Sequence, residues 1–276
     1  MKIKSFLLIL FLLGITLTVF SQKKAELKYN LKKGGHYINS MKINQTIDME
    51  LQGQPMKMDQ EISFIIDSYI SEVYKDSFKI ATTINRVILN QNIMGNQITY
   101  DSDTNIDLEN PMIEQINKVF GGLLHKSIIQ VYDKSGNIIR ADLGELAEDE
   151  VFAQNFGSSL QLPVYPEGKT KIGDSWENNI IPLVKSGIEI KIKYTLEEIE
   201  SGRARISFES TVDSFEDTSM NLEMNGNQTG EIIVDLKSGW SNSSAVKQIV
   251  NMTINQNGMT FPAKVTGKVI TTSNLY

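Results

Sequence analysis

Apolar and polar residues alternate along residues 187–213, and this is the clearest pattern in the chain. A period of two places every apolar side chain on one face of a strand. Ser201 and Gly202 interrupt the alternation with a pair of residues that favours a tight turn. The pattern therefore predicts an antiparallel hairpin with one apolar face and one polar face. Its apolar face carries Ile188, Ile190, Ile192, Tyr194, Leu196, Ala204, Ile206, Phe208 and Val212.

Similar alternation recurs on both sides of this hairpin. Short turns separate the earlier strands, and Asn257-Gly258 gives the strongest turn signal among the later ones. Such short connections favour antiparallel pairing over a βαβ arrangement. The predicted strands cover residues 41–51, 56–70, 77–92, 96–100, 128–133, 138–143, 230–236, 240–255 and 259–272.

The middle of the chain carries helix signals in addition to strand signals. Asn110-Pro111 combines a good N-cap with proline at the first helical position, so we expect a helix that ends near Gly121-Gly122. Residues 144–156 are a second short helix candidate. The segment 157–168 contains Pro163 and Pro166 and is the best candidate for a boundary.

A weak internal repeat connects the two sides of that boundary. The stretch Lys32–Tyr37 resembles Lys171–Trp176, and Tyr69–Glu72 resembles Tyr194–Glu197. We therefore predict a mainly β, β-rich α+β fold, with long curved antiparallel sheets in two weakly repeated halves and short central helices. The halves are residues 22–160 and 161–276, as two units or as one continuous domain.

Residues 1–21 read as a signal peptide. Lys2 and Lys4 precede an apolar run from Phe6 to Phe20, and Ser21 offers a small residue for cleavage. The apolar run is shorter than the roughly 20 residues that span a bilayer as a helix. We expect an exported protein, periplasmic or extracellular, that is not an integral membrane protein after cleavage.

The net charge narrows the choice of partners, and the cysteine content bears on the source of stability. Removal of residues 1–21 takes away two lysines and no acid, which changes the formal charge from −6 to −8. Nucleic acids and anionic membranes bind basic surfaces, so we expect neither as a partner. The chain has no cysteine, so stability depends on core burial.

No catalytic motif is recognisable in the sequence. The two histidines, His36 and His125, lie in different segments with no Ser/His/Asp arrangement around them. We therefore expect no enzyme activity, no catalytic residue, no cofactor and no bound metal. Asp101–Glu109 has oxygen side chains at calcium-loop spacing, but Ile106 stands where the loop needs glycine. We interpret it as a polar loop before the helix, with a weak calcium site as the alternative.

Two short stretches carry a resemblance to a known family. Gly173-Asp174-Ser175-Trp176 and Asp235-Leu236-Lys237-Ser238-Gly239-Trp240 resemble motifs of an exported bacterial protein family of unknown function. The resemblance covers mainly residues 160–272. It implies a fold and an exported location, and it implies no catalytic residue.

The apolar faces of the predicted strands require cover. They can pack on each other as a sandwich, or curl around the central helices as a half-barrel resembling bacterial lipoprotein carriers. Our first hypothesis is a protein that binds a lipid or other apolar ligand on a concave sheet, around Ile190, Ile192, Tyr194, Ile206 and Phe208. It requires a cavity of at least several hundred Å3. The alternative is a structural or protein-interaction module of the cell envelope.

Overall fold

The computed structural model describes residues 23–51, 53–104, 106–146, 161–180, 188–214, 222–256 and 259–276. The predicted signal peptide and most of the second helix candidate lie outside these residues. The described part is dominated by antiparallel strands, so the mainly β prediction is confirmed.

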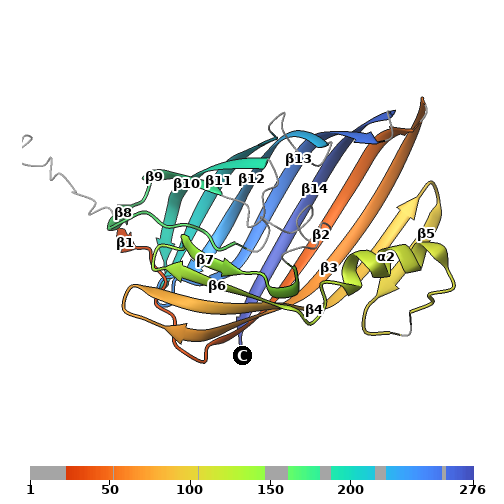
Figure 1. The fold of residues 1–276 in the computed structure, drawn as a ribbon. Helices are drawn as coiled ribbons and strands as arrows, with labels where there is room; N and C mark the ends of the chain where they lie inside the picture. The colour runs from red at the N-terminus through yellow and green to blue at the C-terminus, as the bar shows by residue number, and fades with distance from the viewer. Residues whose placement is uncertain are drawn as a thin grey trace, which may run out of the picture.

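Twelve strands form one large curved antiparallel sheet (Figure 1). Its order is β7-β6-β4-β3-β2-β14-β13-β12-β11-β10-β9, and β5 pairs with the same edge of β4 as β6, at the other end of that strand. The strands are β2 (His36–Leu51), β3 (Gln54–Val73), β4 (Ser77–Ile93), β5 (Asn96–Asp101), β6 (Ser127–Asp133), β7 (Ile138–Asp142), β9 (Ser175–Ile180), β10 (Ile188–Glu200), β11 (Arg203–Ser214), β12 (Leu222–Asp235), β13 (Ser241–Gln256) and β14 (Met259–Leu275).

The two halves of the chain meet along one pair of strands in this sheet. All of β2–β7 lie on one side of the β2–β14 pair, and all of β9–β13 lie beyond β14. The pairing is long, from Ala263↔Met49 to Leu275↔Tyr37. A separate two-stranded sheet, β1 (Lys24–Glu26) with β8 (Lys169–Lys171), also joins the halves.

Strands β3 and β4 bend so that part of the sheet lies over the rest. Register shifts at Ile65/Ile66 and Ile70/Glu72 mark bulges between β3 and β4, and bulges increase local bending and twist. In Figure 1, β6 and β7 consequently cross in front of the ends of β10–β12. Phe78 of β4 and Tyr132 of β6 share one buried core with Ile206 and Val234 of the opposite layer.

Two extended segments fill the space between these layers. Residues 23–35 and 161–168 run through this core, where the Tyr29 and Tyr165 rings pack 4.9 Å apart. The Tyr29 hydroxyl donates to the Pro163 carbonyl (2.9 Å), and the Tyr165 hydroxyl donates to the Gly239 carbonyl (2.8 Å). We call the sheet face that these segments cover the inner face, and the opposite one the outer face.

Helix α2 (Pro111–Gly121) covers another part of the inner face. The Asn110 side chain accepts from the Met112 amide at 3.0 Å, as expected for an N-cap, and confirms the predicted helix start. Its apolar stripe packs against a second core, which includes Phe64 and Tyr100. A single 3-10 turn, η1 (Gly144–Leu146), follows β7.

The halves repeat a turn and a bulge. Gly34 (φ 82°) donates its amide to the Ile70 carbonyl at 2.8 Å, and Gly173 (φ 91°) donates to the Leu196 carbonyl at 2.7 Å. The register then shifts directly after each acceptor, at Ile70/Glu72 and at Leu196/Glu198. Ile70 thus corresponds to Leu196. Tyr69 therefore matches Thr195 in the structure, one residue away from Tyr194, with which the sequence comparison paired it.

A second repeated feature follows β6 and β12. Each strand ends on an aspartate whose carboxylate accepts from amides of the turn: Asp133 from Ser135, and Asp235 from Ser238. The two turns share the letters Lys-Ser-Gly, at residues 134–136 and 237–239. The second turn is longer by one residue, Leu236.

Candidate functional site

A cavity lies between helix α2 and the inner face of the sheet. Its volume is about 490 Å3, which meets the size that the binding hypothesis required. Strands from both halves of the chain form its wall, and Val119 and Phe120 of α2 close it. The sheet contributes Met41, Ile43, Gln45, Gln60, Ile62, Phe64, Gln228, Ser244, Val246, Gln248, Val269 and Thr271.

A smaller space of about 230 Å3 adjoins this cavity and extends toward the core between the layers. Met41, Ser244 and Thr271 line both spaces, so the two lie next to each other along β2, β13 and β14. Polar groups in the smaller space satisfy one another in part, since the Asn39 amide donates to the Ser68 hydroxyl at 3.0 Å.

The lining of both spaces carries no formal charge among the described residues. Every residue that forms the two walls is apolar, a hydroxyl residue, an amide or an aromatic. Tyr132 lines the smaller space, and burial raises the pKa of its hydroxyl well above the usual value, so it stays neutral. The cavity is therefore suited to an uncharged or apolar molecule.

The five residues that the sequence suggested for ligand binding lie together on the inner face. Ile192, Tyr194, Ile206 and Phe208 are buried in the core between the layers, and Ile190 packs against it. None of the five lines either inner cavity. Residues 23–35 and 161–168 cover this end of the sheet, and the Trp176 ring stacks on Tyr194 with centroids 5.5 Å apart.

The inner cavity lies instead over the middle of β2, β3 and β12–β14. Sequence reasoning missed its glutamines, Gln45, Gln60, Gln228 and Gln248. A signal for two of them was present in the sequence. The apolar alternation of residues 41–51 and 56–70 is interrupted at positions 45 and 60, on the face that carries apolar residues elsewhere.

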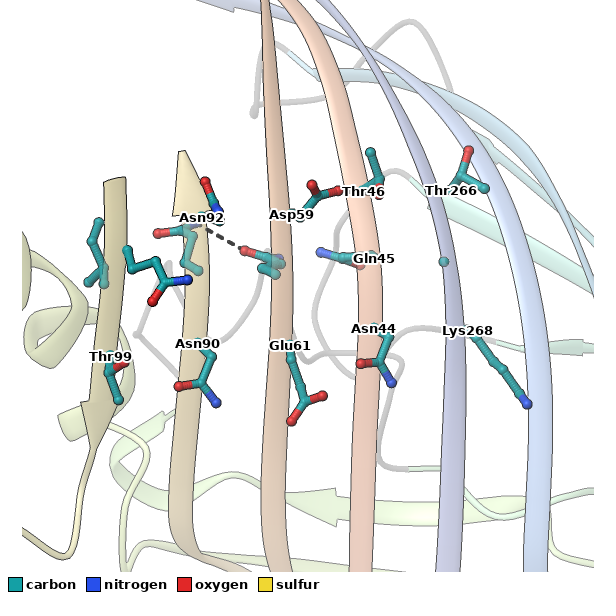
Figure 2. Close-up of a pocket in the computed structure, with 15 residues that line it drawn as sticks. Asn44, Gln45, Thr46, Asp59, Glu61, Asn90, Asn92, Thr99, Thr266 and Lys268 are labelled. Atoms are coloured by element: carbon teal, nitrogen blue, oxygen red, sulfur yellow. Dashed lines mark hydrogen bonds between the residues drawn. The ribbon is translucent and has the colours of Figure 1, made fainter. Parts of the chain in front are cut away.

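A shallow polar depression of about 750 Å3 lies on the outer face of β2–β5 and β14. Figure 2 views it with Thr99 of β5 at the left and Lys268 of β14 at the right, the reverse of the strand order in Figure 1. Asn44, Glu61 and Asn90 form one row across it, between Thr99 and Lys268. These are side chains of the predicted polar face, which solvates the sheet rather than enclosing a ligand.

The Asp101–Glu109 loop is organised by an ion pair and a helix cap. The Asp101 carboxylate accepts from the Arg86 guanidinium at 2.6 and 3.0 Å, and this hydrogen bond holds the pKa of Asp101 below its usual value. Asp103 also approaches Arg86, at 3.5 Å. No cluster of three or more His, Asp or Glu within the described ranges could hold a metal ion.

Residues 134–241 match the model of a family of unknown function (DUF6263). This range contains both sequence motifs, at 173–176 and 235–240, that indicated a family of unknown function. No curated protein matches the chain significantly.

Among solved structures, lipovitellin, described for its lipid–protein interactions, aligns with a TM-score of 0.56 at 10% identity. The alignment covers 88% of this chain and 25% of lipovitellin, so this chain spans about a quarter of that protein's length.

Two bacterial proteins align with lower scores. An outer-membrane channel from Pseudomonas putida F1 has a TM-score of 0.35 at 4% identity, covering 89% of this chain and 97% of the channel. OccK7 from Pseudomonas aeruginosa has a TM-score of 0.26 at 7% identity, covering 88% and 100%. Neither score indicates a shared fold.

Within the described residues, no helix is long and apolar enough to cross a bilayer.

Residues 134–241 are similar to an uncharacterised family, and most of the chain has a fold like part of lipovitellin.

Proposed function

We propose that this protein is an exported, non-enzymatic envelope protein that binds a lipid or other apolar ligand. The observation that carries the proposal is the cavity of about 490 Å3 between α2 and the inner face of the sheet. Ligand pockets of proteins are typically of this size and are lined mainly by apolar side chains. The adjoining space of about 230 Å3 extends the room for a chain-like molecule.

The lining supports this proposal through its composition. Ile43, Ile62, Phe64, Val246 and Val269 present aliphatic or aromatic carbon to the cavity. The absence of charge in the lining favours an apolar body over a charged metabolite. The similarity to lipovitellin, whose structure is described for its lipid–protein interactions, agrees with such a ligand.

Export is part of the same proposal and rests on the sequence. Lys2, Lys4 and the apolar run from Phe6 to Phe20 have the layout of a cleaved signal. A carrier of apolar molecules has a use in the envelope, where lipids must cross water between two surfaces.

The edges of the sheet give less support to the alternative, an interaction module that binds a partner by strand addition. Edge strands β5, β7 and β9 have only 6, 5 and 6 residues. Short edge strands offer few unpaired backbone groups, which disfavours the addition of another strand.

A cavity-filling variant tests the proposal. Val246→Trp places a large side chain into the cavity from β13, whereas Ile249→Trp changes the outer face of the same strand, where Ile249 is half exposed. The probe is N-phenyl-1-naphthylamine, an apolar dye whose fluorescence rises on leaving water. We expect saturable binding by the native protein and by Ile249→Trp, and about tenfold weaker binding by Val246→Trp.

Native mass spectrometry of protein purified from its own host supplies a second readout. We expect a bound lipid in the native protein and its loss in Val246→Trp. Absence of dye binding and of any lipid in the native protein would contradict the proposal.

A further inference from the structure

A row of glutamines crosses the inner face of the sheet at one level. The register pairs Ser210 with Gln228, Gln228 with Gln248, Gln248 with Gly267, Gly267 with Gln45, Gln45 with Gln60, and Gln60 with Gln91. The row therefore spans seven adjacent strands, from β11 to β4. We call Gln45, Gln60, Gln91, Gln228 and Gln248 the glutamine belt.

The belt lies between apolar rows. On one side, the next inward positions include Val246, Val269, Ile43 and Ile62; on the other they include Val250, Val265, Ile47 and Met58. The described strands place no charged side chain in either row or in the belt. All five belt glutamines are partly buried, so their carboxamides lose part of their hydration, and a hydrogen-bond partner offsets that loss.

Side-chain hydrogen bonds within the belt form only at its two ends. At one end the Ser210 hydroxyl donates to Gln228 (3.2 Å), and the Gln228 amide donates to Gln248 (3.3 Å). At the other end the Gln91 amide donates to Gln60 (3.1 Å). The side-chain carboxamide of Gln45, between these two groups, has no hydrogen-bond partner among the described residues.

Gly267 opens a gap at the centre of the belt. A Cβ atom there would lie 2.9 Å from the Gln45 Cβ and 3.5 Å from the Gln248 Nε2, so any side chain would fill the space between the two amides. Gln45, Gln60, Gln228 and Gln248 also line the inner cavity. The gap therefore exposes unused amide donors and acceptors to the cavity that holds the proposed ligand.

We propose that the glutamine belt is the binding site for the polar part of the ligand, and that this part is uncharged. The inference rests on the proposed function and specifies its ligand class. A carboxamide both donates and accepts, so it matches ester, amide or hydroxyl groups. A carboxylate or phosphate would require a cation, which the lining does not provide. The ligand class is a neutral amphiphile, with its apolar part against the aliphatic rows beside the belt.

Competition against N-phenyl-1-naphthylamine tests this assignment on the full-length mature protein. The competitors are 1-monomyristoylglycerol, which is neutral, and myristate at pH 8, which has the same acyl chain and a charge. We expect the neutral compound to bind at least about tenfold more tightly, because amides bind hydroxyl and ester groups without burying an ion.

The double variant Gln45→Met with Gln248→Met removes the amides at the gap with little change of volume. The matched control is Gln97→Met, because Gln97 is exposed and lies on the outer face of β5. We expect the double variant to bind the glyceride about tenfold more weakly and the dye as before. The control retains both affinities.

The outcomes separate the two proposals. Dye binding with equal affinity for glyceride and myristate, or a double variant that keeps the preference, overturns the belt assignment and leaves the apolar cavity standing. Failure of the native protein to bind dye, glyceride or myristate overturns both. The comparison of native-protein affinities stands even where the double variant does not fold.

Discussion

Gly239 shows how closely the covering segment of residues 23–35 packs against the sheet. Its φ is 73°, and a Cβ atom there would overlap the Lys28 carbonyl oxygen. Gly202 has a similar φ of 77° with nothing within 4 Å of its Cβ position. The two glycines therefore share the cost of a left-handed backbone but differ in the space around them.

We expect Gly202→Ala to lower the free energy of unfolding by about 1 kcal/mol, the usual cost of a left-handed alanine. Gly239→Ala adds a backbone overlap, so we expect at least about 3 kcal/mol. Urea denaturation of both variants measures the difference. Equal losses would show that the segment moves freely away from Gly239.

At the scale of elements, the two covering segments are held by buried tyrosines. Burial raises the pKa of Tyr29 and Tyr165 well above the usual value, and it raises the pKa of Tyr194, beneath these segments, to about 12. The folded state therefore keeps these protons at a pH where the unfolded chain, with pKa about 10, loses them. Their contribution to stability is complete below pH ~10 and declines as pH rises toward 12.

Tyr194→Phe removes one of these groups from the titration. Between pH 10 and 12 we expect the free energy of unfolding of the native protein to fall more steeply than that of the variant, by about 1.4 kcal/mol per pH unit. Tyr74→Phe is the control, since Tyr74 is 54% exposed. Parallel pH profiles for the native protein and Tyr194→Phe would be incompatible with a buried neutral hydroxyl at Tyr194.

The alternation of apolar and polar residues predicted most of the strands, and the differences between prediction and structure have physical causes. β12 begins at Leu222, eight residues before the predicted start at Gly230. Gly226 and Gly230 weaken the strand signal, yet each lies where a side chain would collide with a neighbour. At Gly230, a Cβ would be 2.7 Å from the Phe208 ring, so the glycine makes room for an inward aromatic.

The candidate site was harder to predict than the elements that form it. Alternation placed Ile190, Ile192, Tyr194, Ile206 and Phe208 on the correct face, and whether they bind a ligand stays a prediction. The alternation of apolar and polar residues does not indicate which part of that face is covered by other segments of the chain. Cover comes from residues 23–35 and 161–168, which reach Tyr194 only through long-range packing.

At the scale of the whole molecule, the cores indicate how far the two halves depend on each other. One buried cluster combines Phe78 and Tyr132 of the first half with Ile206 and Val234 of the second. The other, around Phe64 and Leu123, contains residues of the first half alone. With the long β2–β14 pairing, the shared cluster predicts that the halves unfold as one cooperative unit.

Leu123→Ala tests that cooperativity, because it damages the first-half core while the reporters lie elsewhere. Leu123 is 1% exposed, so its truncation costs about 2–5 kcal/mol. Trp176 and Trp240, the two tryptophans of the chain, both belong to the second half. We expect their fluorescence midpoint in urea to fall together with the far-ultraviolet circular dichroism midpoint. Ile139→Ala, at a 61% exposed position of β7, serves as the control and leaves both midpoints in place. A tryptophan midpoint that stays fixed while the circular dichroism transition splits would show two independently folding domains joined at the β2–β14 pair.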